Sequence, residues 1–326
     1  MNHALRVLTL AMFALAVASP HASSMAADYP ARAITLIVPF PAGGSTDLTG
    51  RLLASYFAAQ LGPDVKIVVE NRPGASGQLG FTALADARPD GYTLGLVSPP
   101  PLLSIPIERA ARFNLDSFDL IGNIVNDPAA LVVREESPIQ NLKDLIDKAR
   151  ADPGAVTVGS SGNGTDDHLS LLRFEELAGI TVNHVPFAGG SPANAALIGG
   201  HIDVVSMNVG DAFLATGGGA KLRILGQMAR NRGEFARGVP TFAEQGFPLY
   251  FSAYRGLAAP AGLPPAVRTK LVDALANALK NPEFLEKARA TSMPISYMPP
   301  QTYRSLLENV DVELKALWKT RPWTSK

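Results

Sequence analysis

The stretch from residue 34 to 48 constrains the fold of this chain more than any other. Its apolar and largely β-branched start, Ile34 to Val38, is typical of a buried strand. Prolines and glycines interrupt the chain at 39–44, and the apolar spacing from Ser45 to Gly62 predicts a helix. Because the first N–H groups of a helix lack partners inside it and the helix dipole is positive there, this arrangement favours anion binding.

The kind of anion is narrowed by what this turn lacks. It has neither the Gly-Lys-Ser/Thr ending of a Walker loop nor a full dinucleotide fingerprint. Its two glycines, Gly43 and Gly44, let a ligand approach the backbone closely. We therefore expect a small anion, with a carboxylate favoured over a nucleotide, unless the turn only connects its strand to its helix.

Glycine turns between a strand and a helix recur near 43–45, 74–77, 162–165 and 189–191. The predicted strands are 34–38, 65–70, 92–97, 156–159, 181–187, 204–207, 222–227 and 250–259. The predicted helices are 45–62, a short one ending at 87, 142–151, 166–178, one capped by Ser191 with Pro192 first, 265–279 and one from 302. This alternation predicts an α/β fold with mainly parallel sheets flanked by helices, and ligands bind at the carboxyl ends of such strands. Two such sheets facing each other would form one cleft between two lobes.

The N-terminus has the three parts of a secretory signal. Arg6 precedes an apolar core at 7–18, and small residues follow at 22–27. The core is shorter than the ~20 apolar residues that a membrane span needs. We expect residues 1–27 to be a cleaved signal peptide, rather than a buried helix, and the mature chain to begin near Asp28.

The composition excludes several classes of protein. The chain has no cysteine, which removes disulfides, thiolate metal sites and a cysteine nucleophile. Its 29 Lys and Arg residues balance its 29 Asp and Glu residues, so no basic field favours nucleic acid or an anionic membrane. Roughly 300 mature residues can build two cores of ordinary size. We expect an exported soluble protein with no nucleic-acid partner and no stable membrane insertion.

The histidines and carboxylates form no recognisable catalytic or metal site. His168, His184 and His201 match no zinc spacing, and a His-Glu-x-x-His motif is absent. A Gly-x-Ser-x-Gly nucleophile turn is absent as well. We expect His184 to pack in its apolar strand, whereas His168 could donate to an anion or orient the turn at 162–165. The sequence thus predicts reversible binding with no catalytic residue, metal or cofactor, in preference to an exported enzyme.

Ordered motifs along the whole mature chain resemble one family of binding proteins. The first is Tyr29-Pro30, followed by the segment 37–44 with Asp47. The others are the segments 70–77, 89–94, 159–162 with His168, 185–190, 199–203 and 256–264. In these motifs the chain is similar to the Bug (TctC-like) proteins, the periplasmic substrate-binding proteins of tripartite tricarboxylate transporters.

The resemblance implies a fold, a location and a partner. The fold would be that of type II periplasmic binding proteins, with a ligand cleft between two α/β lobes. With crossovers near 128–133 and 247–252, lobe 1 would comprise 28–130 and 250–326, and lobe 2 would comprise 131–249. The resemblance further implies a periplasmic monomer that captures a small organic carboxylate, such as a di- or tricarboxylate, for inner-membrane permease subunits.

The resemblance also implies how the carboxylate is held, mainly by backbone N–H groups, hydroxyls and bridging waters. The matching positions in lobe 1 are Gly43, Gly44, Ser45, Thr46, Asp47 and Ser98. The matching positions in lobe 2 are Ser161, Gly162, Asn163, Gly164, Thr165, Gly189, Gly190, Ser191 and, as the weakest, Asn208. His168 joins this set if it donates to the anion.

Two departures from the family pattern bear on the ligand. Three prolines at 99–101 predict a stiff loop after Ser98. Asp166 and Asp167 could repel the far end of a dicarboxylate or attract an amine, although we expect them to face solvent. The ligand therefore stays open among di- and tricarboxylates, aromatic carboxylates and acidic amino acids. Presentation of the ligand to a membrane sensor is a further alternative to a permease.

Overall fold

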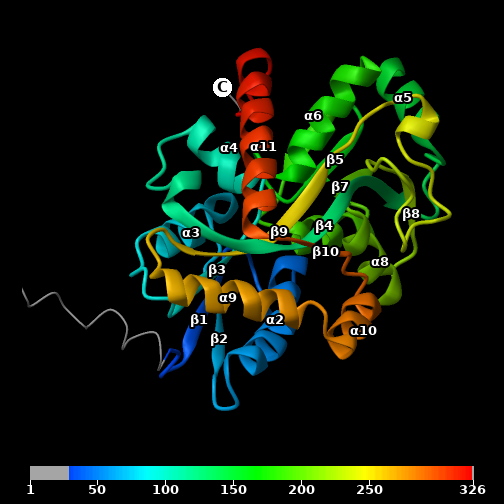
Figure 1. Cartoon of the computed structure of the whole chain (residues 1–326). Coiled ribbons are helices and arrows are strands. Elements are labelled where there is room, and N and C mark those ends of the chain that lie inside the picture. The colour runs from blue at the N-terminus through cyan, green and yellow to red at the C-terminus, as the bar shows by residue number, and fades with distance from the viewer. Residues whose placement is uncertain (1–28, 325–326) are drawn as a thin grey trace, which may run out of the picture.

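The computed structural model of the protein describes residues 29–324, so the predicted signal peptide lies outside the described residues. Strands and helices alternate through most of this range (Figure 1). The strands are β1 (Ile34–Val38), β2 (Ile67–Asn71), β3 (Thr93–Val97), β4 (Phe118–Arg134), β5 (Thr157–Ser160), β6 (Asn183–Pro186), β7 (Val204–Asn208), β8 (Leu222–Gln227), β9 (Ser252–Pro260) and β10 (Ile295–Met298). The helices are α2 (Ser45–Leu61), α3 (Gln78–Ala85), α4 (Pro101–Glu108), α5 (Leu142–Ala151), α6 (Asp166–Ala178), α7 (Gly190–Ile198), α8 (Val209–Gly217), α9 (Pro265–Ala278), α10 (Pro282–Ala290) and α11 (Pro300–Thr320). Between residues 29 and 324, no helix combines the length and apolar character that crossing a membrane requires.

The long strand β4 joins two halves of a ten-stranded sheet, in which eight strands follow the order β2-β1-β3-β9-β4-β7-β5-β6 and the other two, β8 and β10, each pair with β4. At one end β1 runs parallel to β2 and β3, and at the other end β5 runs parallel to β6 and β7. Strand β4 pairs with β9 as far as Pro128 and with β7 from Ala129 onward, antiparallel in both cases. The predicted α/β class is confirmed. The lobe boundaries at 130 and 250 stay predictions, and the change of partner within β4 falls close to the first of them.

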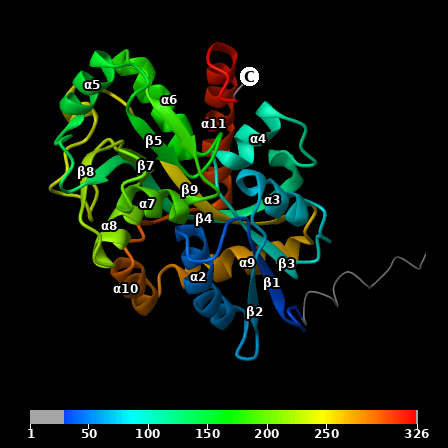
Figure 2. The same cartoon turned by 180° about the vertical axis from the view of Figure 1, so that it is seen from behind.

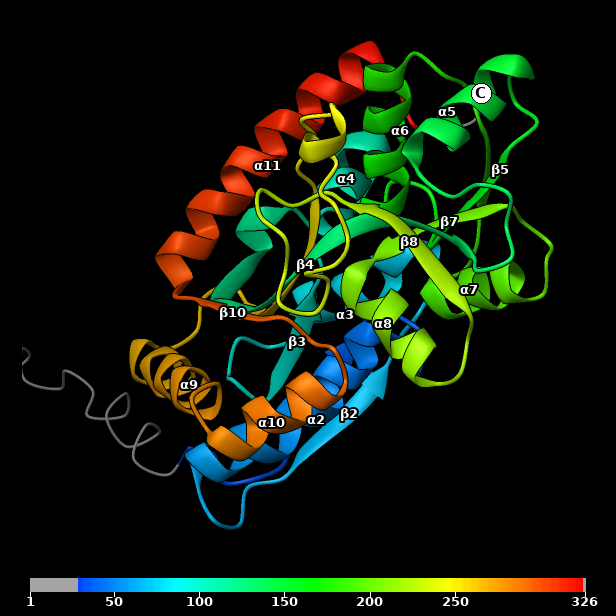
Figure 3. The same cartoon turned by 90° about the vertical axis from the view of Figure 1, so that its right-hand side faces the viewer.

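Helices cover both faces of the first half of the sheet, because alternate side chains of a strand point to opposite faces. In β1, Leu36 and Val38 join a core formed with α2, α9 and α10, whereas Ile37 joins a core formed with α3, α4 and α11. The period of α2 matches this role, since Leu53, Phe57 and Leu61 fall on one buried stripe. Figure 3 shows α2 and α10 side by side below the sheet, with α11 along its other side.

The second half of the sheet is covered in the same way. Leu131 and Val133 of β4 pack against α5 and α6, whereas Ala130 and Val132 pack against α7 and α8. Seen from behind, α7 and α8 lie close to the start of α2 from the first half (Figure 2). The two halves therefore meet at helix N-termini, where a cleft was predicted.

Two predictions about local structure were wrong, and some elements of the structure were not predicted. Pro101 begins α4 in place of a stiff loop, because a proline at the first helical position loses only an N–H that has no partner anyway. Helix α7 begins at Gly190 and not after Ser191, since Gly189 caps it with a φ of 134° that favours glycine. The elements β4, α8, α10 and β10 were not predicted.

Candidate ligand-binding site

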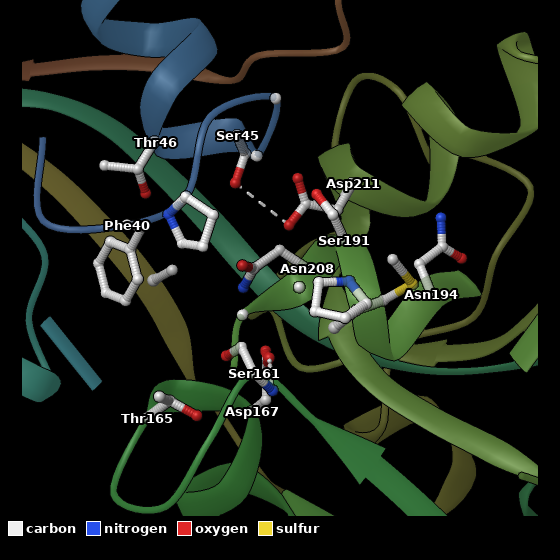
Figure 4. A pocket seen from close by; sticks show the side chains of 18 of the residues that line it. Phe40, Ser45, Thr46, Ser161, Thr165, Asp167, Ser191, Asn194, Asn208 and Asp211 are labelled. Atoms are coloured by element: carbon white, nitrogen blue, oxygen red, sulfur yellow. Dashed lines mark hydrogen bonds between the residues drawn. The ribbon is translucent and has the colours of Figure 1, made fainter. Parts of the chain in front are cut away.

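A cavity of about 290 Å³ lies where the first turns of α2, α6, α7 and α8 meet (Figure 4). Ligand pockets commonly measure ~300–1,000 Å³, so this cavity suits a small molecule. Its lining includes these residues predicted from the sequence: Gly43, Gly44, Ser45, Thr46, Ser98, Ser161, Thr165, Gly189, Gly190, Ser191 and Asn208. The other predicted residues lie outside the lining: Asp47, Gly162, Asn163, Gly164 and His168. A role for any of them in ligand binding stays a prediction.

Asp47 shapes the first turn of α2 from behind the cavity. Its Oδ2 accepts hydrogen bonds from the Gly43 N–H and from Arg51 Nε, both at 2.9 Å, and its Oδ1 accepts one from Asn71 Nδ2 at 2.9 Å. Although burial raises the pKa of this carboxyl, the hydrogen bonds from Arg51, Gly43 and Asn71 lower it below its ordinary value. The Asp47 carboxylate is therefore hydrogen-bonded within and behind the turn and does not line the cavity. The first turn of α2 thus contributes no acidic side chain to the cavity.

His168 holds the turn before α6. Its Nδ1 accepts a hydrogen bond from the Gly164 N–H at 3.2 Å, and its ring stacks on His184 at 3.9 Å with an interplanar angle of 6°. Burial and, to a smaller extent, the neighbouring His184 lower the pKa of His168 to about 3. Of the two roles open for His168, the geometry favours the orientation of the turn. His184 is half-buried and bonded to Ser160 Oγ at 2.6 Å, which agrees with a packing role.

Asp166 and Asp167 correct the sequence prediction, because they are buried against the cavity and do not face solvent. They are 8% and 4% exposed and both line the cavity. Asp166 Oδ2 accepts from Asn208 Nδ2 at 2.9 Å, and Asp167 Oδ2 accepts from the Ser161 N–H at 3.0 Å. Burial raises the pKa of both carboxyls, and the charge of Asp166 adds to the increase for Asp167.

Arg255 is a lining residue that the sequence prediction missed. Its guanidinium, 4% exposed, lies 3.4 Å from Asp127 Oδ2 and 3.9 Å from Asp211 Oδ2. Its Nη2 also donates to Ser45 Oγ at 2.7 Å. Burial raises the pKa of Asp127 to about 7 against the opposing effect of Arg255. A signal was present in the sequence, since a lone arginine within an apolar strand requires buried partners.

Ser98 presents an unsatisfied hydroxyl at the end of β3. It is 7% exposed and lines the cavity, and its Oγ has no hydrogen-bond partner among the described residues. Buried polar atoms are rarely left without a partner in native proteins. Within the described part of the chain, this buried hydroxyl therefore lacks the hydrogen-bond partner that such atoms normally have.

Comparison with known proteins identifies the family. Residues 50–321 match the model of the tripartite tricarboxylate transporter family receptors, TctC. The chain belongs to this family, which confirms the resemblance to the Bug proteins. The protein BugT from Bordetella pertussis is 32% identical over 307 residues, which cover 91% of this chain and 92% of BugT.

Solved structures of similar proteins share the fold. An R. palustris protein with adipate has a TM-score of 0.83 and 27% identity, and the match covers 90% of this chain and 98% of the R. palustris protein. MatC from Rhodopseudomonas palustris with bound malate has a TM-score of 0.79 and 27% identity, and the match covers 90% of this chain and 99% of MatC. The two-lobed fold of periplasmic binding proteins is thus confirmed, and both family and fold are those of solute-binding proteins.

Proposed function

We propose that this protein is a periplasmic receptor that captures one small organic carboxylate in the cavity for the permease of a tripartite tricarboxylate transporter. The convergence of helix starts on the cavity carries this proposal. The N-cap residues of α2, α6, α7 and α8 accept no hydrogen bond from the first turn with their side chains. The N–H groups and helix dipoles at the starts of α2 and α7 favour a negatively charged ligand, whereas acidic side chains from the first turns of α6 and α8 also line the cavity.

The first turns of α2 and α7 form the most favourable binding position for the carboxylate group of the ligand. The first turn of α7 contains no acidic residue, and the Asp47 carboxylate of α2 is held by Gly43, Arg51 and Asn71. The two turns also approach each other, since a Cβ on Gly44 would lie 3.9 Å from Ser191 Oγ. A carboxylate between them would bind backbone N–H groups from both halves of the molecule.

Contacts between the halves support a clamp that closes on its ligand. Ser104 Oγ donates to the Gly164 carbonyl at 2.6 Å, and Ser76 Oγ donates to the Asn163 carbonyl at 3.0 Å. With lobes at 28–130 plus 250–326 and at 131–249, these bonds cross from one lobe to the other. A ligand that contacts both lobes favours the closed state through its higher affinity for that state.

A thermal-shift screen of C4–C6 di- and tricarboxylates, aromatic acids and amino acids tests the proposal. A ligand at 100 times its Kd stabilises a protein by about 2.7 kcal/mol, so a clear increase in Tm is expected for at least one carboxylate. Mass spectrometry should recover that compound unaltered, whereas its conversion would favour an enzyme. If no carboxylate raises the Tm, the proposed function is wrong.

A further inference from the structure

The cavity is chemically different at its two ends. The first turns of α2 and α7 line it with no acidic side chain of their own, and the carboxylate beside them, Asp211, accepts from Ser45 Oγ at 3.3 Å and pairs with Arg255 at 3.9 Å. The start of α6 instead places two adjacent carboxylates there, Asp166 and Asp167. A ligand that complements both ends needs an anionic group for the first end and a hydrogen-bond donor or cation for the second.

The one cation of the described lining forms no salt bridge with Asp166 or Asp167, although its charge opposes the rise that burial causes in the pKa of Asp166. Arg255 is the only basic residue among the described residues that line the cavity, and it pairs with Asp127 and Asp211. Asp166 and Asp167 form no salt bridge in the described part of the chain, and each receives a neutral donor on its Oδ2. The second carboxylate oxygen of each remains for a donor brought by a ligand.

The Ser98 hydroxyl gives independent evidence that the cavity is built for a polar ligand. Ser98 is more than nine-tenths buried on the other half of the molecule from α6, and its Oγ has no partner among the described residues. A buried hydroxyl without a partner lowers stability, so its presence in the lining points to a bound group that completes it.

We infer that the ligand is an amino acid or another zwitterion, whose carboxylate lies at the α2 and α7 turns and whose ammonium lies between Asp166 and Asp167. This inference rests on the proposed function, because it names the kind of carboxylate that the receptor takes. A dicarboxylate would place its second charge beside two buried carboxylates that form no salt bridge among the described residues, and like charges disfavour such a complex. An ammonium at the same point would supply N–H donors and the missing positive charge.

Calorimetric titration of matched ligand pairs tests the inference. In each pair the amino acid differs from the diacid by an ammonium in place of one carboxylate: β-alanine with succinate, 4-aminobutyrate with glutarate, and 5-aminopentanoate with adipate. Aspartate compared with succinate tests an ammonium on the α-carbon. We expect at least one amino acid to bind ten times or more tightly than its diacid.

Variants locate the origin of this preference. Asp166→Asn and Asp167→Asn each retain an oxygen that can accept the bond from Asn208 or from Ser161, while they remove the charge. Either change should weaken amino-acid binding about tenfold, and the double variant should bind the diacid at least as well as the amino acid. Asp144→Asn is the matched control, because Asp144 also lies in a first helical turn and accepts a backbone N–H, from Gln140 at 2.8 Å, but outside the cavity.

The possible outcomes distinguish a failure of this inference from a failure of the proposed function on which it rests. Tighter binding of a diacid than of its amino acid, or an unchanged preference in the double variant, overturns the inference and leaves the carboxylate receptor intact. Binding of no acid from either series overturns both.

Discussion

Replacing Arg255 with methionine tests whether the ion pairs beside the cavity hold the fold together. Arg255 and Asp127 are 4% and 2% exposed, and their charged atoms lie 3.4 Å apart. At that distance and an effective dielectric constant of ~20, Coulomb's law gives an attraction of about 5 kcal/mol. The loss of hydration by both charges offsets part of this attraction. Removal of one partner alone is costly, because it leaves the other charge buried and unpaired.

We therefore expect Arg255→Met to lower the free energy of unfolding by about 3–5 kcal/mol. The double variant Arg255→Met with Asp127→Asn should recover much of this loss, because asparagine is neutral and still accepts the Gly210 N–H that Asp127 binds at 2.9 Å. Urea unfolding followed by circular dichroism at about pH 8, without ligand, measures both values. At that pH most of Asp127, with its pKa of about 7, is ionised.

A surface pair supplies the control for this experiment. Arg72 and Glu70 lie 2.8 Å apart but are 46% and 43% exposed, so Arg72→Met should change the unfolding free energy by less than about 1 kcal/mol. The reasoning is refuted if Arg255→Met is as stable as the Arg72→Met control. A double variant no more stable than Arg255→Met alone would also contradict it.

Further changes test packing and ionisation. Gly256→Ala places a Cβ 2.4 Å from Cε1 of buried Tyr303, so urea unfolding should show a loss of about 1–3 kcal/mol, and no loss would contradict the packing. Phe174→Ala empties a fully buried site and should cost about 3–5 kcal/mol, measured as a lower Tm. The pKa of Asp127 is raised to about 7, so this carboxyl keeps its proton up to a higher pH in the folded state than in the unfolded state. The stabilisation that this protonation provides at acid pH is therefore lost as pH rises toward 7. Asp127→Asn should therefore reduce the fall in unfolding free energy between about pH 4 and about pH 7, and an unchanged fall would contradict this ionisation.

The glycine turns were predictable because their geometry is local. Gly189 needs a left-handed φ and Gly43 has one of 83°, so glycine itself indicates these turns. The carboxyl ends of parallel strands then bring the turns to one edge of the sheet. Most of the predicted residues of these turns accordingly line one cavity.

The ion cluster and β4 depend on distant contacts that a local pattern does not contain. Asn126, Asp127 and Pro128 interrupt the apolar run of β4, and pairing with β9 places Asp127 opposite Ala253, close to Arg255. Helix α8 follows β7 without a turn, since Asn208 both ends the strand and caps the helix. The pattern therefore predicted the end of the strand to within one residue but not the helix that follows it.

The burial of Asp166 and Asp167 has the same kind of explanation. Acidic residues in a first helical turn are usually solvated and stabilised by the helix dipole, which is why a solvent-facing position was expected. Here the neighbouring strand ends supply Asn208 and the Ser161 N–H as partners, so tertiary structure replaces water.

The central claim, that a small carboxylate binds in this cavity, is tested most directly by filling the cavity. Gly190 lines the cavity and a Cβ on it would meet no atom within 4 Å, so Gly190→Leu adds a bulky side chain to the lining without a clash at Cβ. Gly238 is equally open but does not line the cavity, so Gly238→Leu is the control. With the carboxylate found by the screen, calorimetry should show at least about tenfold weaker binding to Gly190→Leu and unchanged binding to Gly238→Leu. Equal affinity of Gly190→Leu and the wild type would contradict the claim.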